Sequence, residues 1–532
     1  IARRIRRIGG VILVHFQKHT GMGVVCAVAY FDPGNWGVDL QAGSEYGYRL
    51  LFVVLLAGLF AAYLQVLAAR LGCVTGIDLA SHTRLLLFNR PKHTQLYRWL
   101  GLYPLYVLAE VAIIATDLAE LLGSAIALCL LFPQLELWHG VLITAFDVLL
   151  FFAMGDPLRG RPVKAFELLI SALVLAILIC MVIIISRVHV NWGNAFDGYV
   201  PSKYMFASGG IYTSVGILGA TIMPHSLYLG STLATQDRIH CRDIETDNNG
   251  VTSVGSTGSE DSARLEKKIS LVQRLCKCCN FKESVLHAFR RPPASAHSTT
   301  ATRHCEHHNN PLYFIKAHIY HATFDVVGSL LGFAVMINSL ILMLASAVFF
   351  YGKGQTATDG PASLFDAYDL IRDWVGQSAA TLFAIALLCS GQSSSIIATV
   401  AGQAVCEGFL QWRVSPVIRR LVTRLIAIVP SMAVALIVGR QGIDTLLVAS
   451  QVILAIVLPF VTFPLLYCTS SKAIMSVRKT PPVLVSIRDV GMAENADTDE
   501  IVDFSNNKLA VCIGITIWLV IVAANFYAIV EL

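Results

Sequence analysis

Long apolar runs, separated by short polar segments, follow one another along the chain from about residue 21 to the end. A helix needs roughly 20 mainly apolar residues to cross the hydrocarbon core of a bilayer. Eleven segments fit, and some of them, such as 50–69 and 326–352, contain no Asp, Glu, Lys or Arg. The pattern therefore predicts eleven membrane-spanning helices, at about 21–43, 48–70, 101–124, 138–155, 165–186, 208–235, 321–350, 378–401, 417–438, 444–468 and 509–530.

Composition supports an all-α polytopic membrane protein. Apolar residues make up 55% of the 532 residues and charged residues only 14%, whereas soluble domains carry about 25% charged residues. The 13 cysteines are scattered, many inside apolar runs, which does not fit a disulfide framework. We expect a lipid bilayer and small ions as partners, and no nucleic acid.

Basic residues alternate between the two sides of the predicted spans. The segment "ARRIRR" precedes span 1, and Lys and Arg gather in the loops after spans 2, 4, 6, 8 and 10, while the loop after span 7 is acidic. By the positive-inside rule the N-terminus is cytosolic. We expect the protein in the plasma membrane or in a vacuolar or endosomal membrane. The predicted organisation is a cytosolic segment (1–20), spans 1–6 (21–235), a cytosolic loop (236–311), spans 7–10 (312–470), a second cytosolic loop (471–508) and span 11 (509–532).

Two of the predicted spans contain residues that interrupt a helix. Span 1 carries "DPGNW" (32–36) and span 6 carries "MPH" (223–225). Proline removes a backbone donor and clashes with the preceding turn, and non-helical backbone at membrane depth requires a protein-lined or water-filled cavity. The two breaks lie five spans apart, in opposite orientations, which predicts an inverted 5+5 repeat with a site between two discontinuous helices.

The residues at these breaks suggest a ligand. Asp32 offers a carboxylate, Asn35 an amide oxygen, and the unwound turns free backbone carbonyls, for instance at Ala29 and Ala220. Met223 offers a thioether, and a soft sulfur beside hard oxygens favours transition metals while keeping Mn²⁺ and Fe²⁺ possible. Against this interpretation, methionine in a membrane helix is usually a packing residue.

These motifs resemble the Nramp family of proton-coupled divalent-metal transporters. Besides the two breaks, the sequences "ATDLAELLG" (115–123), "GQSSS" (391–395), "RRLVTR" (419–424) and "SQVILAIVLPF" (450–460) fit that family. The resemblance runs from about residue 20 to 470 and implies an inverted-repeat, LeuT-like (APC-type) fold. It implies a transporter rather than an enzyme, with no bound cofactor, Mn²⁺ or Fe²⁺ as cargo and H⁺ as the coupling ion.

The resemblance also assigns ligands. It implies that Asp32, Asn35 and Met223 bind the metal, with the carbonyl of Ala220 and the side chain of Gln451 contributing in some conformations. The chain departs from the family's usual pattern at Ser226 and Gly230, where an asparagine and a second histidine often stand, so proton transfer through that histidine is not available. The "MPHS" version resembles the fungal branch.

Span 3 contains three acidic residues that point to proton transfer. Glu110, Asp117 and Glu120 lie within about 80° of one another on a helix, and acids inside a membrane often form proton relays. The predicted proton pathway joins Asp32, His225 and these acids to arginines of span 9, Arg420 and Arg424, with Arg419 as a boundary charge. The alternative is a structural salt bridge between spans 3 and 9, and the two roles are compatible.

The loop 236–311 is longer than the family's usual link. It holds "CKCCN" (276–280) and "HCEHHNN" (304–310). Such tracts are able to bind metal, but their spacing matches no known zinc module, and we expect a disordered insertion or an error in the gene model.

Other functions remain open from the sequence. A non-transporting membrane sensor on the same fold would need no intact ligand set, and a sodium-coupled transporter of another substrate would more often show glycine-rich turns than Asp, Asn and Met. A metalloprotease is not supported, because no HExxH motif occurs. Metal preference, stoichiometry and oligomeric state do not follow from the sequence.

Overall fold

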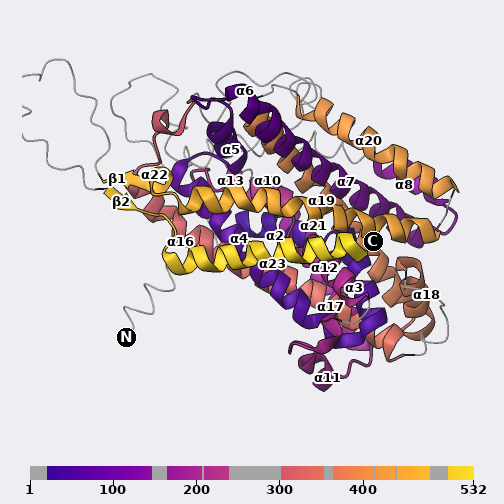
Figure 1. The fold of residues 1–532 in the computed structure, drawn as a ribbon. Helices are drawn as coiled ribbons and strands as arrows, with labels where there is room; N and C mark the ends of the chain where they lie inside the picture. Colours follow the sequence, from indigo (N-terminus) through magenta and orange to yellow (C-terminus); the bar gives the residue numbers. More distant parts are fainter. Residues whose placement is uncertain are drawn as a thin grey trace, which may run out of the picture.

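The computed structural model describes residues 21–145, 164–206, 209–238, 301–352, 363–411, 415–437, 440–479 and 501–531, and these are almost entirely helical. Many of the long helices run side by side, with α23 crossing one face of the bundle (Figure 1). The elements up to residue 233 are α2 (Met22–Val28), η2 (Ala29–Phe31), α3 (Pro33–Tyr46), η3 (Gly47–Leu50), α4 (Leu51–Thr75), α5 (Leu79–Leu87), α6 (Thr94–Tyr97), η4 (Arg98–Leu102), α7 (Tyr103–Leu131), α8 (Leu137–Ala145), α10 (Lys164–Arg187), α11 (Trp192–Asp197), η5 (Lys203–Phe206), α12 (Gly210–Thr221) and α13 (Pro224–Leu233).

The second half follows the same helical pattern and adds one small sheet. In that sheet Val477 of β1 lies opposite Val502 of β2 in an antiparallel pair. The elements are η7 (His304–Glu306), α16 (Leu312–Ser329), η8 (Leu330–Val335), α17 (Met336–Ala345), η9 (Ser346–Phe350), α18 (Leu364–Trp374), α19 (Gln377–Leu410), α20 (Pro416–Ile437), α21 (Arg440–Ser470), α22 (Lys472–Met475), β1 (Ser476–Arg478), β2 (Ile501–Asp503) and α23 (Lys508–Glu531).

The described helices confirm a polytopic membrane protein. Seven helical segments are long and apolar enough to cross a bilayer, and the first of them joins α3 to α4. Two shorter apolar helices, Met22–Phe31 and Leu421–Ile437, add to them. The predicted fourth span continues beyond Ala145, outside the described residues, so the count of eleven stays a prediction. The seven are Pro33–Thr75, Thr94–Leu131, Phe166–Arg187, Leu312–Phe350, Gln377–Leu410, Thr445–Ser470 and Lys508–Val530.

Two helices extend further than hydropathy alone indicates. The seventh predicted span begins at Leu312 rather than at 321, and the third ends at Leu131 rather than at 124. In the added turns of α16, Leu312 and Ile315 are buried while Tyr313 is exposed. A helix that is buried on one face stays stable beyond the apolar segment, because packing holds its amphipathic end.

Loops that were predicted on one side of the membrane meet at one end of the molecule. The Asn310 N–H donates to the carbonyl of Val74 at 3.0 Å, and the Asn309 amide donates to the carbonyl of Ile474 at 2.7 Å. These contacts join the segments that follow spans 2, 6 and 10. α5, α22 and the sheet lie at this end, and α11 and α18 lie at the other (Figure 1). The arrangement fits the predicted alternation of sides, and which end is cytosolic stays a prediction.

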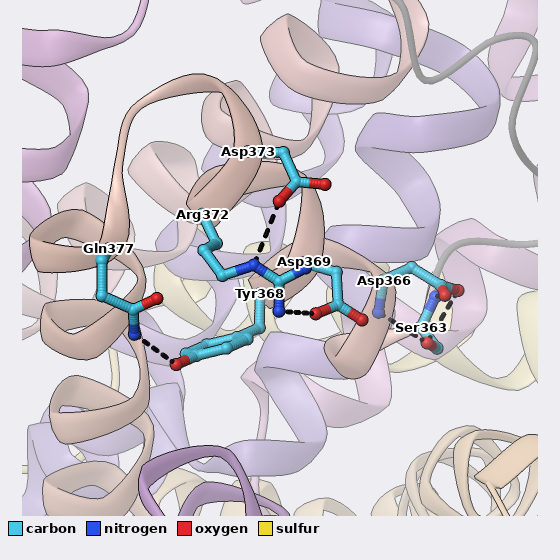
Figure 2. A network of polar contacts seen from close by, with 7 residues as sticks. All are labelled: Ser363, Asp366, Tyr368, Asp369, Arg372, Asp373 and Gln377. Atoms are coloured by element: carbon cyan, nitrogen blue, oxygen red, sulfur yellow. Dashed lines mark hydrogen bonds and ion pairs between the residues drawn. The ribbon is translucent and has the colours of Figure 1, made fainter. Parts of the chain in front are cut away.

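The acidic segment after span 7 forms α18, where its charges are engaged locally (Figure 2). Asp366 caps the helix together with Ser363, each side chain accepting from the other residue's backbone N–H. Arg372 contacts Asp369 at 2.8 Å and Asp373 at 3.0 Å. Both pairs are exposed, so they contribute little to stability.

Candidate metal site

The first helix is interrupted at Asp32, as predicted. Asp32 has an extended backbone (φ −63°, ψ 169°) between η2 and α3, and its Oδ1 accepts the N–H of Asn35 at 3.0 Å. Pro33 occupies the first position of α3, where its missing N–H costs nothing. The same sequence that unwinds the span therefore also starts and caps its second half.

The sixth predicted span is interrupted in the same way. α12 ends at Thr221, Met223 is extended (φ −73°, ψ 119°), and Pro224 opens α13. The side chain of Met223 is fully buried. The prediction of two discontinuous helices is confirmed, and each second half begins with proline.

The two breaks face each other. The Nδ2 of Asn35 donates to Asp32 Oδ1 at 2.7 Å and to the carbonyl of Ala220 at 2.8 Å. On the other side of the break, the hydroxyl of Ser226 donates to the carbonyl of Cys26 at 3.4 Å. Two of the predicted ligands, Asp32 and the Ala220 carbonyl, thus lie within hydrogen-bonding distance of the amide nitrogen of a third, Asn35, which stands between two oxygens that a cation would use.

Further buried oxygens adjoin this cluster. Asp32 Oδ2 and Gln451 Oε1 are buried and accept no hydrogen bond from the described residues. Gly34 keeps α3 close to α21, because a Cβ at that position would overlap the amide of Gln451 and lie 3.1 Å from Asp32 Oδ2. Ala29 is buried in η2, one turn before the break. Asp32, Asn35, the Ala220 carbonyl and Gln451 therefore lie at the junction of α3, α12 and α21, and Ala29 and Met223 belong to the two breaks beside it.

Two residues at this junction were not predicted. Asn338 of α17 donates to the carbonyl of Tyr30 at 2.8 Å and to Asn35 Oδ1 at 3.2 Å. Ser390 of α19 donates to the carbonyl of Phe31 at 2.6 Å. They hold the carbonyls that the break exposes. In the sequence, the feature that could have identified them is a polar residue inside an apolar run, such as Asn338 in "VMINSLI" (335–341).

Several residues of the predicted proton pathway lie close to one another. Asp117 and Glu120 are fully buried on α7, and Thr116 Oγ1 lies 3.4 Å from Nδ1 of His225, which places α13 beside them. Arg424 is also buried, and its guanidinium donates to the backbone carbonyl of Asp117 at 3.4 Å. The same group donates to Ser395 Oγ at 3.0 Å.

The interpretation of Arg419 was wrong. Its Nη2 lies 2.7 Å from both carboxylate oxygens of Glu110, and the two side chains are only 11% and 17% exposed. Gly402 of α19 leaves room for this guanidinium, because a Cβ there would overlap it. Adjacent residues on a helix point about 100° apart, so position alone did not reveal which arginine faces α7. The side chain of Arg420 lies outside the described residues.

Comparisons with known proteins fit this geometry. Residues 23–254 and 295–488 match the family model described as natural resistance-associated macrophage protein-like (Nramp). The chain is 38% identical to the manganese transporter pdt1 of Schizosaccharomyces pombe, over 97% of this chain and 85% of that protein. It is 36% identical to the iron transporter SMF3 of Saccharomyces cerevisiae, over 98% and 97%.

Solved structures agree on the fold. A crystal structure of the Eremococcus coleocola manganese transporter aligns with a TM-score of 0.67 at 28% identity, covering 96% of this chain and 86% of that one. The nucleobase-cation-symport transporter MHP1 aligns with a TM-score of 0.51 at 11% identity, over 85% and 78%, which supports the shared fold alone. With its two interrupted helices, its full-length relatives and its family match, the chain belongs to the Nramp family.

Proposed function

We propose that this protein carries divalent transition-metal ions, Mn²⁺ or Fe²⁺, across the membrane toward the cytosol, together with protons. The observation that carries the proposal is the meeting of the two helix breaks, where Asn35 contacts both Asp32 and the carbonyl of Ala220. The names of the relatives, a manganese transporter and an iron transporter, support the choice of cargo.

The ion would bind where the Asn35 amide nitrogen now stands. A turn of that amide presents its oxygen, and Asp32 and the Ala220 carbonyl then lose a donor and gain a cation. Met223 adds a thioether, and Ala29 and Gln451 add oxygens in some conformations. The sulfur disfavours Ca²⁺ and Mg²⁺, which prefer oxygen ligands only. An uncompensated Asp32 carboxylate at membrane depth is costly, so a cation stabilises it.

Protons and metal would compete for the same carboxylate. A proton leaves Asp32 when the metal binds, and His225, Asp117 and Glu120 lie next along the buried face of α7 and α13. Glu110 would follow, together with the arginines of span 9, Arg424 and Arg420. Coupling then arises because one carboxylate cannot hold both a proton and a divalent ion.

The test is uptake of Mn²⁺, Fe²⁺, Cd²⁺ and Ca²⁺ into proteoliposomes at two pH values. We expect uptake of the first three that increases with an inward proton gradient and is abolished by Asp32→Ala. The matched control is Asp369→Asn, which alters an exposed acid and should leave uptake unchanged. Uptake retained in Asp32→Ala would remove that residue from the site, and uptake that requires Na⁺ instead of protons would favour the sodium-coupled alternative.

A further inference from the structure

A cavity of about 530 Å³ lies at the end of the molecule where the loops after spans 2, 6 and 10 meet. Its wall includes His82 of α5, the backbone around β1, and the His–Cys tract (residues 304–310). The tract contributes four residues with metal-binding donors to the lining of this one cavity: His304, Cys305, His307 and His308. The transport mechanism uses none of them.

The His–Cys tract is fixed to the helices at its C-terminal end. Asn309 donates to the carbonyls of Ile474 and Ser476 at 2.7 and 2.8 Å, and Asn310 donates to the carbonyl of Cys73 at 2.9 Å. Gly76 has φ +74°, and a Cβ there would crowd the Asn310 side chain. These bonds correct the expectation of disorder for the last part of the loop, since residues 301–311 pack against α4 and α22.

Hydrogen bonds select one ring nitrogen of His304 for a ligand. The Thr75 hydroxyl donates to the carbonyl of Leu71 at 2.7 Å, so it accepts from His82 Nε2 at 2.9 Å. His82 Nδ1 is then an acceptor, and it lies 3.0 Å from His304 Nε2. The neutral His304 ring therefore carries its proton on Nε2 and keeps a lone pair on Nδ1.

His307 is oriented by a similar contact. Its Nε2 lies 2.7 Å from the carbonyl of Thr75, which only accepts, so the neutral ring again keeps its lone pair on Nδ1. Metal-binding histidines usually donate their other N–H to a carbonyl or a comparable acceptor, which fixes the ring for the metal. Two histidines of one short tract have this arrangement and line the same cavity.

We propose that the His–Cys tract is a second metal site, for a borderline or soft divalent ion of the Zn²⁺ and Cd²⁺ class, with His304, His307, Cys305 and His308 as donors. Imidazole and thiolate are the ligands that such ions prefer. Within the described ranges, no three His, Cys, Asp or Glu side chains already surround a common point. Binding therefore requires the exposed Cys305 and His308 to turn toward the two oriented histidines.

The charge around the cavity restricts which ions bind. Arg478 also lines it, and its positive charge opposes a cation held by neutral ligands alone. A thiolate offsets that charge, so Cys305 is the donor on which affinity depends most. Hard ions such as Mg²⁺ and Ca²⁺, which gain little from sulfur, are excluded.

The test is Cd²⁺ titration of the full chain in detergent, followed by the thiolate-to-metal charge-transfer absorption in the ultraviolet. The background carries Asp32→Ala and Met223→Ala, which remove the transport site, and serine at Cys276, Cys278 and Cys279. We expect one Cd²⁺ per chain with a charge-transfer band. Since the transport site is absent from this background, the result is independent of the proposed function.

Three substitutions decide the outcome. Cys305→Ser should abolish the band and weaken binding at least tenfold, and since the side chain is exposed it should not disturb folding. His304→Gln and His307→Gln should keep the band and also weaken binding at least tenfold. Cys512→Ser, at another exposed cysteine, is the matched control and should change neither. Absence of Cd²⁺ binding in the folded background, or a band that survives Cys305→Ser, would overturn the proposal.

Discussion

The pair of Glu110 and Arg419 allows the structural role of span 3 to be separated from a role in proton transfer. One guanidinium nitrogen lies 2.7 Å from both carboxylate oxygens, across the contact between α7 and α20. Removing one partner of a fully buried ion pair costs about 3–5 kcal/mol, because the other charge stays buried alone. The side chains here keep 11% and 17% exposure, so we expect about 2–4 kcal/mol for Glu110→Gln.

A double-mutant cycle isolates the interaction. Arg419→Gln should destabilise the protein by a similar amount, whereas Glu110→Gln with Arg419→Gln should cost less than the sum, because no uncompensated charge remains. We expect a coupling energy of about 1–3 kcal/mol, the range for residues in direct contact. The assay is unfolding of the four proteins in one detergent, with metal uptake measured on the same preparations.

One outcome would refute the energetic reasoning, and the uptake measurement decides the role of Glu110. If the two single substitutions add without coupling, the contact does not stabilise the helices. If uptake in the stable double variant keeps the wild-type dependence on the proton gradient, Glu110 is a structural residue and leaves the proposed pathway. A double variant that is stable and transports metal without responding to the gradient would instead assign Glu110 to proton transfer.

Three further predictions concern the helix breaks. Met223→Ala should admit Ca²⁺ better while weakening Cd²⁺ binding, and unchanged selectivity in uptake would count against the thioether as a ligand. Gly123→Ala places a Cβ against the ring of Pro33, so the free energy of unfolding in detergent should fall by about 1–3 kcal/mol. The control is Gly328→Ala, which has open space beside it and should leave that free energy unchanged. Asn338→Ala removes the donor that holds the Asn35 amide with its nitrogen toward Asp32, so calorimetric Cd²⁺ affinity should rise, and an unchanged affinity would limit Asn338 to packing.

Sequence reasoning succeeded where a local feature decides the structure. A proline at the start of each second half suits the first turn of a helix and interrupts the turn before it, and at Asp32 a capping carboxylate adds to this. The interruptions at Asp32 and Met223 could therefore be predicted from a few residues each. Their spacing by five spans then indicated opposite orientations. The contact of Asn35 with the Ala220 carbonyl is the tertiary consequence of that local chemistry.

It failed where partners depend on rotation of a helix about its axis. The packing of α20 on α7 and the space beside Gly402 decide which of the two adjacent arginines, Arg419 or Arg420, faces span 3. Neither feature can be predicted from the sequence alone. Asn338 was overlooked for a related reason. An uncharged amide leaves the hydropathy of its span almost unchanged, although its two donor contacts hold the first break in place.

One helical segment contacts both the start and the break of the interrupted first helix. Asn338 of α17 donates to Asn35 at the break, and Asp325 of α16 accepts the backbone N–H of Gly23, at the start of α2, at 2.6 Å. Only the π-helical segment η8 separates α16 from α17, and such segments are frequent at functional sites. In the proposed mechanism, a cation that turns the Asn35 amide would change the group that faces Asn338. The segment that would sense this change is the one that also contacts α2 through Asp325, and α2 is separated from α3 by the break at Pro33.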